Sequence, residues 1–179
     1  MPVSRPTLVS EEEFLALPES VDRIELVDGE VIVSPSPSVW HQELLSRIVH
    51  RLRSWQEAHA RSVFIGQAPL DVRFGPGRIL QPDAFLCLGD VSFDLEGPLD
   101  RIPDLCIEVL STNRAYDRLT KRLLYAGAAV EELWLVEPSG SIERWTGQGL
   151  NEAELVTETL TTPLLPAFEL DVEQLFRRR

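Results

Sequence analysis

The chain has 179 residues, of which 44% are hydrophobic and 26% are charged. This length and composition fit one globular domain over 1–179. No apolar run approaches the roughly 18 residues of a membrane-spanning helix, and the N-terminus lacks the apolar core of a secretion signal. We therefore expect a cytoplasmic protein without a membrane partner. The formal net charge of −12 weighs against nucleic acid as a partner, because phosphate groups are normally bound by a basic surface.

Capping and turn residues predict a short helix followed by a hairpin. The segment 10–13 has the spacing of a capping box, which predicts a helix that runs through Glu19. Asp28-Gly29 predicts a two-residue turn between strands over 23–27 and 30–33.

The longest predicted helix covers 39–60, where apolar residues recur at spacings of three and four. One face of this helix should pack on a sheet. The same periodicity places His41 at the head of the buried stripe. Arg47, Arg51 and Arg53 fall outside the stripe, so we expect them to be mostly solvated.

Strand-like runs alternate with turns in the middle of the chain. The runs 62–67 and 70–74 predict one bent strand, and 79–88 predicts a strand that carries Asp83. The run 105–110 is nearly all apolar, as expected of a central strand covered on both faces. Cysteines in such runs are expected to be buried free thiols rather than a disulfide, and this applies to Cys87 and Cys106.

The last third of the chain predicts a helix over 115–128 and a strand over 132–136. Strand, helix and strand in this order imply a parallel crossover. A hairpin of 142–145 with 155–159 and a C-terminal helix capped by Asp171 follow. The order of elements predicts an α/β (α+β) protein with a mixed sheet.

Two carboxylates, Asp83 and Glu108, lie inside these apolar runs. Burying a carboxylate is costly unless it is paired, hydrogen-bonded or bound to a metal. A divalent cation held by both residues, with the backbone carbonyl of Val109 as a further ligand, explains them together. The alternatives are a backbone hydrogen bond for Asp83 and a buried ion pair for Glu108.

A further group lies on the predicted helix, where Asp117, Lys121 and Tyr125 are spaced by four and share one face. Lys121 can reach back over the end of the Glu108 strand. Alternatively, Lys121 pairs with Asp117 on the surface, and Tyr125 belongs to the core.

Other candidates carry weaker signals. Glu25 either lines the same cleft or is structural, and His41 is either a site residue or a core-edge histidine bonded to a carbonyl. Five arginines form either a phosphate-facing patch or solvated helix positions, namely Arg47, Arg51, Arg114, Arg118 and Arg122.

Taken in order, Pro-Asp at 82–83, Glu-Val-Leu-Ser at 108–111 and Asp-x-x-x-Lys-x-x-x-Tyr at 117–125 resemble the PD-(D/E)XK nuclease superfamily. More narrowly, the chain resembles a bacterial family of uncharacterised restriction-endonuclease-like proteins, from Glu12 through Phe176. The other segments that carry the resemblance are Glu-Leu-Val-Asp-Gly-Glu at 25–30, His41, Gln81 and Glu-Leu-Trp at 132–134.

The resemblance implies a restriction-endonuclease-like core of the order helix-strand-strand-strand-helix-strand, with an added N-terminal hairpin and a C-terminal hairpin. It also implies that Asp83 and Glu108 bind Mg²⁺, with Mn²⁺ as a substitute, and that a lysine positions or activates the attacking water. In the common pattern this lysine stands two residues after the second acid, where this chain has Leu110. Lys121 fits a version of the pattern in which the lysine has moved to the next helix.

We therefore expect a Mg²⁺-dependent nuclease acting on DNA, in which Asp83, Glu108 and Lys121 are catalytic. A homodimer is also expected, because a two-fold dimer cuts both strands of palindromic DNA most simply. Two rivals stay open. One is a catalytically silent nuclease-fold protein used for binding or assembly, which the negative charge favours, and the other is a metal-dependent hydrolase of a smaller substrate. If Lys121 is catalytic, its removal should abolish cleavage and leave the thermal stability nearly intact.

Overall fold

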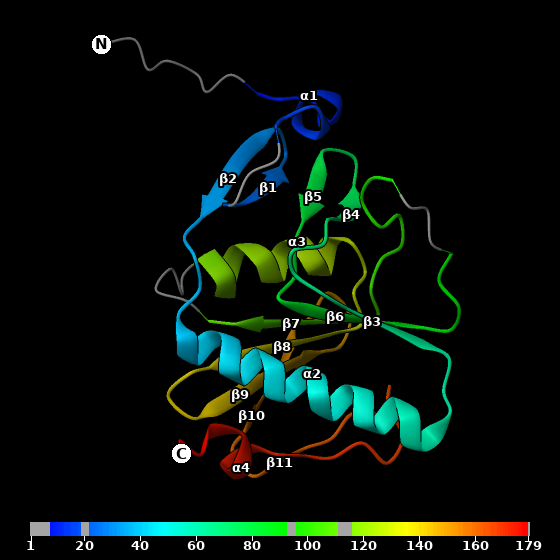
Figure 1. The fold of residues 1–179 in the computed structure, drawn as a ribbon, viewed down its shortest axis with the longest axis vertical. Helices are drawn as coiled ribbons and strands as arrows, with labels where there is room; N and C mark the ends of the chain where they lie inside the picture. Colours follow the sequence, from blue (N-terminus) through cyan, green and yellow to red (C-terminus); the bar gives the residue numbers. More distant parts are fainter. Residues whose placement is uncertain (1–7, 19–21, 93–95, 111–115, 179) are drawn as a thin grey trace.

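The computed structural model describes residues 8–18, 22–92, 96–110 and 116–178, with the backbone alone at Tyr116 and Asp117. Two larger sheets, one small sheet and the helices around them make up the described fold (Figure 1). Within these ranges, no helix is both long enough and apolar enough to cross a membrane.

The N-terminal part forms a helix and a four-stranded antiparallel sheet of order β2-β1-β5-β4. Its elements are α1 (Glu11–Leu15), β1 (Arg23–Val27), β2 (Glu30–Ser34), β4 (Val72–Gly75) and β5 (Arg78–Leu80). The predicted hairpin is confirmed, and both of its turn residues have positive φ, 50° at Asp28 and 89° at Gly29, as a turn that matches the strand twist requires.

The capping box at Ser10 and Glu13 is also confirmed, but α1 is shorter than predicted. It ends at Leu15 instead of running through Glu19, which lies outside the described residues. Pro18 has no backbone N–H and disfavours helical dihedrals in the residue before it. The helix therefore ends ahead of this proline.

The second large sheet has six strands in the order β10-β9-β8-β7-β6-β3. The bounds are β3 (Val63–Gln67), β6 (Ala84–Leu88), β7 (Leu105–Val109), β8 (Glu132–Glu137), β9 (Ser141–Thr146) and β10 (Glu152–Val156). Strands β7 and β8 are parallel and the other neighbours are antiparallel, which confirms the predicted mixed sheet. β7 is entirely buried in the interior of the sheet, as expected for the run 105–110.

Two of the predicted strands are each divided between the two sheets. The segment 62–74 is not one bent strand, because β3 belongs to the six-stranded sheet and β4 to the four-stranded sheet. Pro69 between them cannot donate a ladder hydrogen bond. The predicted strand over 79–88 divides in the same way into β5 and β6, at Gln81-Pro82-Asp83. Asp83 therefore directly precedes β6, where the chain passes from one sheet to the other.

Helices cover both faces of the six-stranded sheet (Figure 1). The predicted long helix is confirmed as α2 (Val39–His59), and its apolar stripe joins the core on one face through Leu44, Leu45, Ile48, Leu52 and Trp55. On the other face, a π-helix, η1 (Tyr116–Lys121), leads into α3 (Arg122–Gly127). Leu124 and Tyr125 of α3 pack there with residues of β4 to β8.

The second strand of the C-terminal hairpin begins closer to the turn than predicted. β10 covers Glu152–Val156 rather than 155–159, because Thr146 pairs with Glu152 directly beside the tight turn. Thr159–Leu160 instead forms β11, which pairs with β12 (Leu170–Asp171). The final helix, α4 (Val172–Phe176), is capped by Asp171 as predicted, since its side chain accepts from Gln174 N.

Candidate active site

Asp83 and Glu108 are neighbours across two adjacent strands. β6 and β7 pair antiparallel with Ala84 opposite Ile107, so the next position in register places Asp83 opposite Glu108. Both carboxylates are buried, with 3% and 2% of their surface exposed. The structure thus brings together the two acids that the sequence singled out.

Asp83 is held by a backbone group and by His41. Its Oδ2 accepts from the backbone N–H of Val109 at 2.8 Å and lies 3.0 Å from Nε2 of His41. The alternative of a backbone hydrogen bond for Asp83 is therefore realised without excluding a site role. Val109 contributes its N–H here, and its carbonyl as a metal ligand stays a prediction.

Glu108 accepts from two side chains of the helical segment. Nζ of Lys121 lies 3.0 Å from Glu108 Oε1, and the hydroxyl of Tyr125 donates to the same oxygen at 2.5 Å. Lys121, the only lysine of the chain, is 2% exposed. A surface pair with Asp117 therefore does not describe this lysine, whose ammonium is buried against Glu108 and, at 3.3 Å, against Glu25.

The helix that carries Lys121 differs from the predicted one. An α-helix over 115–128 was expected to align Asp117, Lys121 and Tyr125 on one face, but Lys121 ends a π-helix and Tyr125 lies in α3. A π-helix has wider turns than an α-helix, so a spacing of four no longer relates Asp117 to Lys121. Lys121 and Tyr125 share a face as predicted, because both contact Oε1 of Glu108. The side chain of Asp117 lies outside the described part of the chain, as does Arg114.

Glu25 and Arg23 extend the cluster from β1 of the other sheet. Glu25 is fully buried, and its Oε1 accepts from the backbone N–H of Gln81 at 2.8 Å. Arg23 Nη1 lies 2.6 Å from Asp83 Oδ1, and its Nη2 lies 3.8 Å from Glu108 Oε2. The sequence reasoning missed Arg23, although it stands two residues before Glu25 in a strand and therefore shares its face.

These contacts set the charge states of the two acids. Burial alone would raise the pKa of Asp83, but the His41 hydrogen bond and the charges of Arg23 and Lys121 lower it to about 2. Burial raises the pKa of Glu108 to about 7, against the opposing charge of Lys121 and with the help of the Asp83 carboxylate.

The acids also shift the pKa values of the groups around them. Burial opposes the charge of Lys121, yet Glu108 and Glu25 outweigh it and raise the pKa of the ammonium. Burial disfavours the cationic form of His41 too, but Asp83 raises its pKa. Burial, reinforced by Glu108, raises the pKa of Tyr125 well above its ordinary value, so its hydroxyl acts as a hydrogen-bond donor.

The chemistry of this cluster fits a hard divalent cation, because carboxylate and carbonyl oxygens are its preferred ligands. Oε2 of Glu25 is a buried carboxylate oxygen without a hydrogen-bond partner among the described groups. Asp83 and Glu108 both face one cation, the guanidinium of Arg23. In the described ranges, no group of three or more His, Cys, Asp and Glu side chains is already spaced to hold a metal ion.

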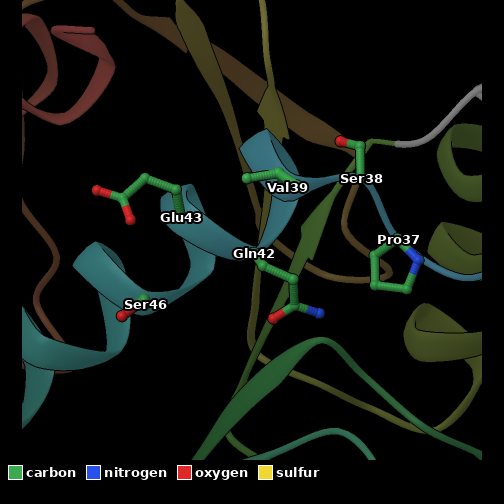
Figure 2. A pocket seen from close by; sticks show the side chains of 6 residues that line it. All are labelled: Pro37, Ser38, Val39, Gln42, Glu43 and Ser46. Carbon is green, nitrogen blue, oxygen red and sulfur yellow. The ribbon is translucent and has the colours of Figure 1, made fainter. Parts of the chain in front are cut away.

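A surface hollow of about 490 Å³ lies at the first turns of α2 and does not include the acids. Figure 2 shows its lining, which comes from the loop before α2 and from the helix itself, through Pro37, Ser38, Val39, Gln42, Glu43 and Ser46. The hollow adjoins His41 in sequence, but neither Asp83 nor Glu108 lines it. We therefore place the candidate site at the buried cluster and not in this hollow.

The described arginines of the predicted phosphate patch contact other groups of the protein. Arg47 donates to the carbonyls of Leu175 and Arg177, and Arg51 donates to that of Glu169. Arg51 is exposed as expected, whereas Arg47 is half-buried, and both link the C-terminal segment to α2.

The other described arginines near these elements are also paired. Arg118 lies 2.7 Å from Glu143, and Arg122 donates to the carbonyl of Leu150 and lies over the ring of Trp145. Arg53 is exposed, as expected, and donates to the backbone carbonyl of Ile65 in β3. The four described arginines of the predicted patch therefore all have partners within the protein.

Comparison with known proteins supports the fold and the family. A crystal structure described as a putative nuclease belonging to DUF820 from Anabaena variabilis ATCC 29413 matches with a TM-score of 0.78 and 23% identity, over 94% of this chain and 97% of the other. This likeness confirms the predicted fold class. Among curated proteins, none matches the chain. The model of the family "Uma2: Putative restriction endonuclease" matches residues 11–173, and the chain therefore belongs to the Uma2 family.

Proposed function

We propose that this chain is a divalent-cation-dependent nuclease that cleaves DNA, with Asp83 and Glu108 holding Mg²⁺ and Lys121 assisting. Mn²⁺ should substitute for Mg²⁺. Membership of the Uma2 family supports nuclease chemistry. The observation that carries the proposal is the position of the only lysine, buried and 3.0 Å from Glu108, beside the carboxylate of Asp83. Burial of three such groups together serves no packing purpose, and perturbed groups of this kind gather at functional sites.

Each side chain has a role that follows from its contacts. The chemistry that Mg²⁺ supplies when bound is to polarise the scissile phosphate and to acidify a water molecule. Lys121 stays protonated, so it can orient that water or stabilise the developing negative charge. Tyr125 fixes Glu108 by donating to Oε1, and His41 and the N–H of Val109 fix Asp83. The Val109 carbonyl is the proposed further ligand.

The rivals retain specific support. A silent nuclease-fold protein used for binding or assembly is favoured by Arg23, which neutralises the acids with the protein's own charge. A hydrolase of a smaller substrate is favoured by the engagement of the described arginines and by the net charge of −12. Both features reduce the attraction of the surface for a polyanion.

A plasmid assay tests the proposal. We expect the wild type to nick or linearise supercoiled DNA in Mg²⁺ or Mn²⁺ but not in EDTA, and Asp83→Asn to be inactive. Asp28→Asn is the matched control, because Asp28 pairs with Arg78 at the surface away from the cluster. Cleavage that survives in Asp83→Asn would exclude this site. Hydrolysis of an aryl phosphodiester without plasmid cleavage would favour the smaller substrate, and inactivity on both would favour the silent protein.

We also propose that the protein forms a homodimer. β2 and β10 lie at the edges of their sheets, and exposed edge strands offer surfaces for pairing. Sedimentation velocity at micromolar concentration should show a dimer. A single monomeric species under these conditions would contradict the proposal.

A further inference from the structure

The guanidinium of Arg23 is surrounded by oxygen atoms in the way a bound cation is. Its Nη1 lies 2.6 Å from Asp83 Oδ1, and its Nη2 lies 3.4 Å from Glu25 Oε1 and 3.8 Å from Glu108 Oε2. Nη2 also donates to the backbone carbonyl of Gln81. Three carboxylates and one backbone carbonyl are ligand types that hard divalent cations select. Arg23 therefore uses the oxygens that a metal ion would use.

Two buried polar atoms are unsatisfied with Arg23 in this position. Nε of Arg23 and Oε2 of Glu25 are buried without hydrogen-bond partners in the part of the chain that the structure describes, which is unfavourable for both groups. Oε2 of Glu25 is therefore a carboxylate oxygen available to a divalent ion.

Arg23 can leave the cluster while Lys121 stays. Lys121 contacts Oε1 of Glu108, whereas Arg23 faces Oε2 of the same carboxylate. The side chain of Arg23 is 22% exposed, against 4% for Asp83 and 2% for Glu108. Arg23 is also the first residue of β1 and is absent from the described hydrophobic core clusters. Its departure does not require the hydrophobic core to open.

We propose that Arg23 is an internal cation that occupies the metal position, and that a divalent ion binds Asp83 and Glu108 by displacing its guanidinium. The inference rests on the metal site of the proposed function. Metal binding is then an exchange of cations, and the apparent affinity is lowered by the contacts that Arg23 gives up.

Direct measurement of Mn²⁺ binding tests the exchange without relying on cleavage. We would titrate the wild type, Arg23→Gln and Arg23→Lys with Mn²⁺ and follow the free ion by electron paramagnetic resonance. Arg78→Gln is the matched control, because Arg78 also pairs with a carboxylate in the same sheet but lies at the surface. We expect Arg23→Gln to bind Mn²⁺ about tenfold more tightly than the wild type or more, Arg23→Lys to be intermediate, and Arg78→Gln to be unchanged.

The outcomes separate this inference from the proposed function. If the wild type binds Mn²⁺ and Arg23→Gln binds it no more tightly, the exchange is wrong and the metal site stands. If neither protein binds Mn²⁺, both the metal site and the exchange are wrong. Binding by Arg23→Gln alone supports the exchange. Should Arg23→Gln lose its fold without metal, circular dichroism must show that Mn²⁺ restores it, since the ion replaces the missing charge. Failure of Mn²⁺ to restore the fold would overturn the inference.

Discussion

Lys121 and Glu108 form a buried ion pair, with 3.0 Å between Nζ and Oε1, across an interval of thirteen residues. A second carboxylate, Glu25, lies 3.3 Å from the same ammonium. This geometry corrects the expectation that removing Lys121 leaves the stability nearly intact. Removing one member of a buried pair leaves an uncompensated charge in the interior, which is strongly unfavourable.

We predict that Lys121→Met lowers the free energy of unfolding by about 3–5 kcal/mol in metal-free buffer. Urea denaturation followed by circular dichroism measures this loss. The double variant Lys121→Met with Glu108→Gln removes both charges and should recover part of the stability. Equal stability of the wild type and Lys121→Met would show that the pair is not buried in solution. At a temperature where the single variant is folded, cleavage should fall about a hundredfold or more.

Tyr125 tests how Glu108 is held. Tyr125→Phe removes the hydroxyl that donates to Glu108 but keeps the ring, whose centroid lies 5.0 Å from that of Phe74. Loss of a hydrogen bond to a charged group should cost about 1.5–3 kcal/mol of stability, as measured by urea denaturation. Tyr125→Leu, which also loses the ring contact, should cost more. A Tyr125→Phe variant as stable as the wild type would contradict the contact.

Gly66 tests the packing of the sheet beside the site. A Cβ at this position in β3 would overlap the ring of Phe85 on β6, and Phe85 is fully buried. Gly66→Ala should therefore destabilise the protein by about 1–3 kcal/mol through overpacking. Gly127→Ala is the control, because its nearest neighbour is the end of the Arg78 side chain at 3.7 Å. Thermal unfolding should separate the two variants, and Phe85→Leu should partly rescue Gly66→Ala.

Cys87 gives a prediction for alkaline pH. Burial raises the pKa of its thiol from 9.0 to about 11, so the folded protein keeps a proton that the unfolded chain releases between these values. The contribution of this thiol to stability is therefore complete below pH 9 and is lost as the pH rises through 11. Between pH 8 and 10.5, the urea midpoint of the wild type should fall more than that of Cys87→Ala. Parallel falls would show that Cys87 does not contribute.

Local signals predicted much of the fold. The Asp28-Gly29 turn, the apolar stripe of α2 and the apolar run of β7 each act within a few neighbouring residues, and each was read correctly. The passages between sheets at Pro69 and at Pro82 were not predicted. Each of these prolines lies between two strands that are both largely apolar. The periodicity alone therefore cannot show that the two strands belong to different sheets.

The candidate site was predicted as a set of residues but not as a set of contacts. Asp83, Glu108 and Lys121 were identifiable because charged residues are costly in apolar surroundings. The contacts of Arg23 with Asp83 and Glu108 depend on the docking of β1 beside the other sheet. This docking is a property of the tertiary structure. The burial of Lys121 could not be predicted either, since a spacing of four from Asp117 describes an exposed α-helical pair equally well.

Two ion pairs of the charged cluster differ greatly in the sequence separation of their partners. The Lys121 to Glu108 contact closes a loop of 13 residues, whereas the Arg23 to Asp83 contact closes one of 60. Loop closure becomes entropically more expensive with length, and distant contacts form more slowly. We therefore expect the half of the cluster on β7 and the following helices to assemble first during folding. The N-terminal sheet would then dock last, and with it Arg23, whose guanidinium faces Asp83 and Glu108.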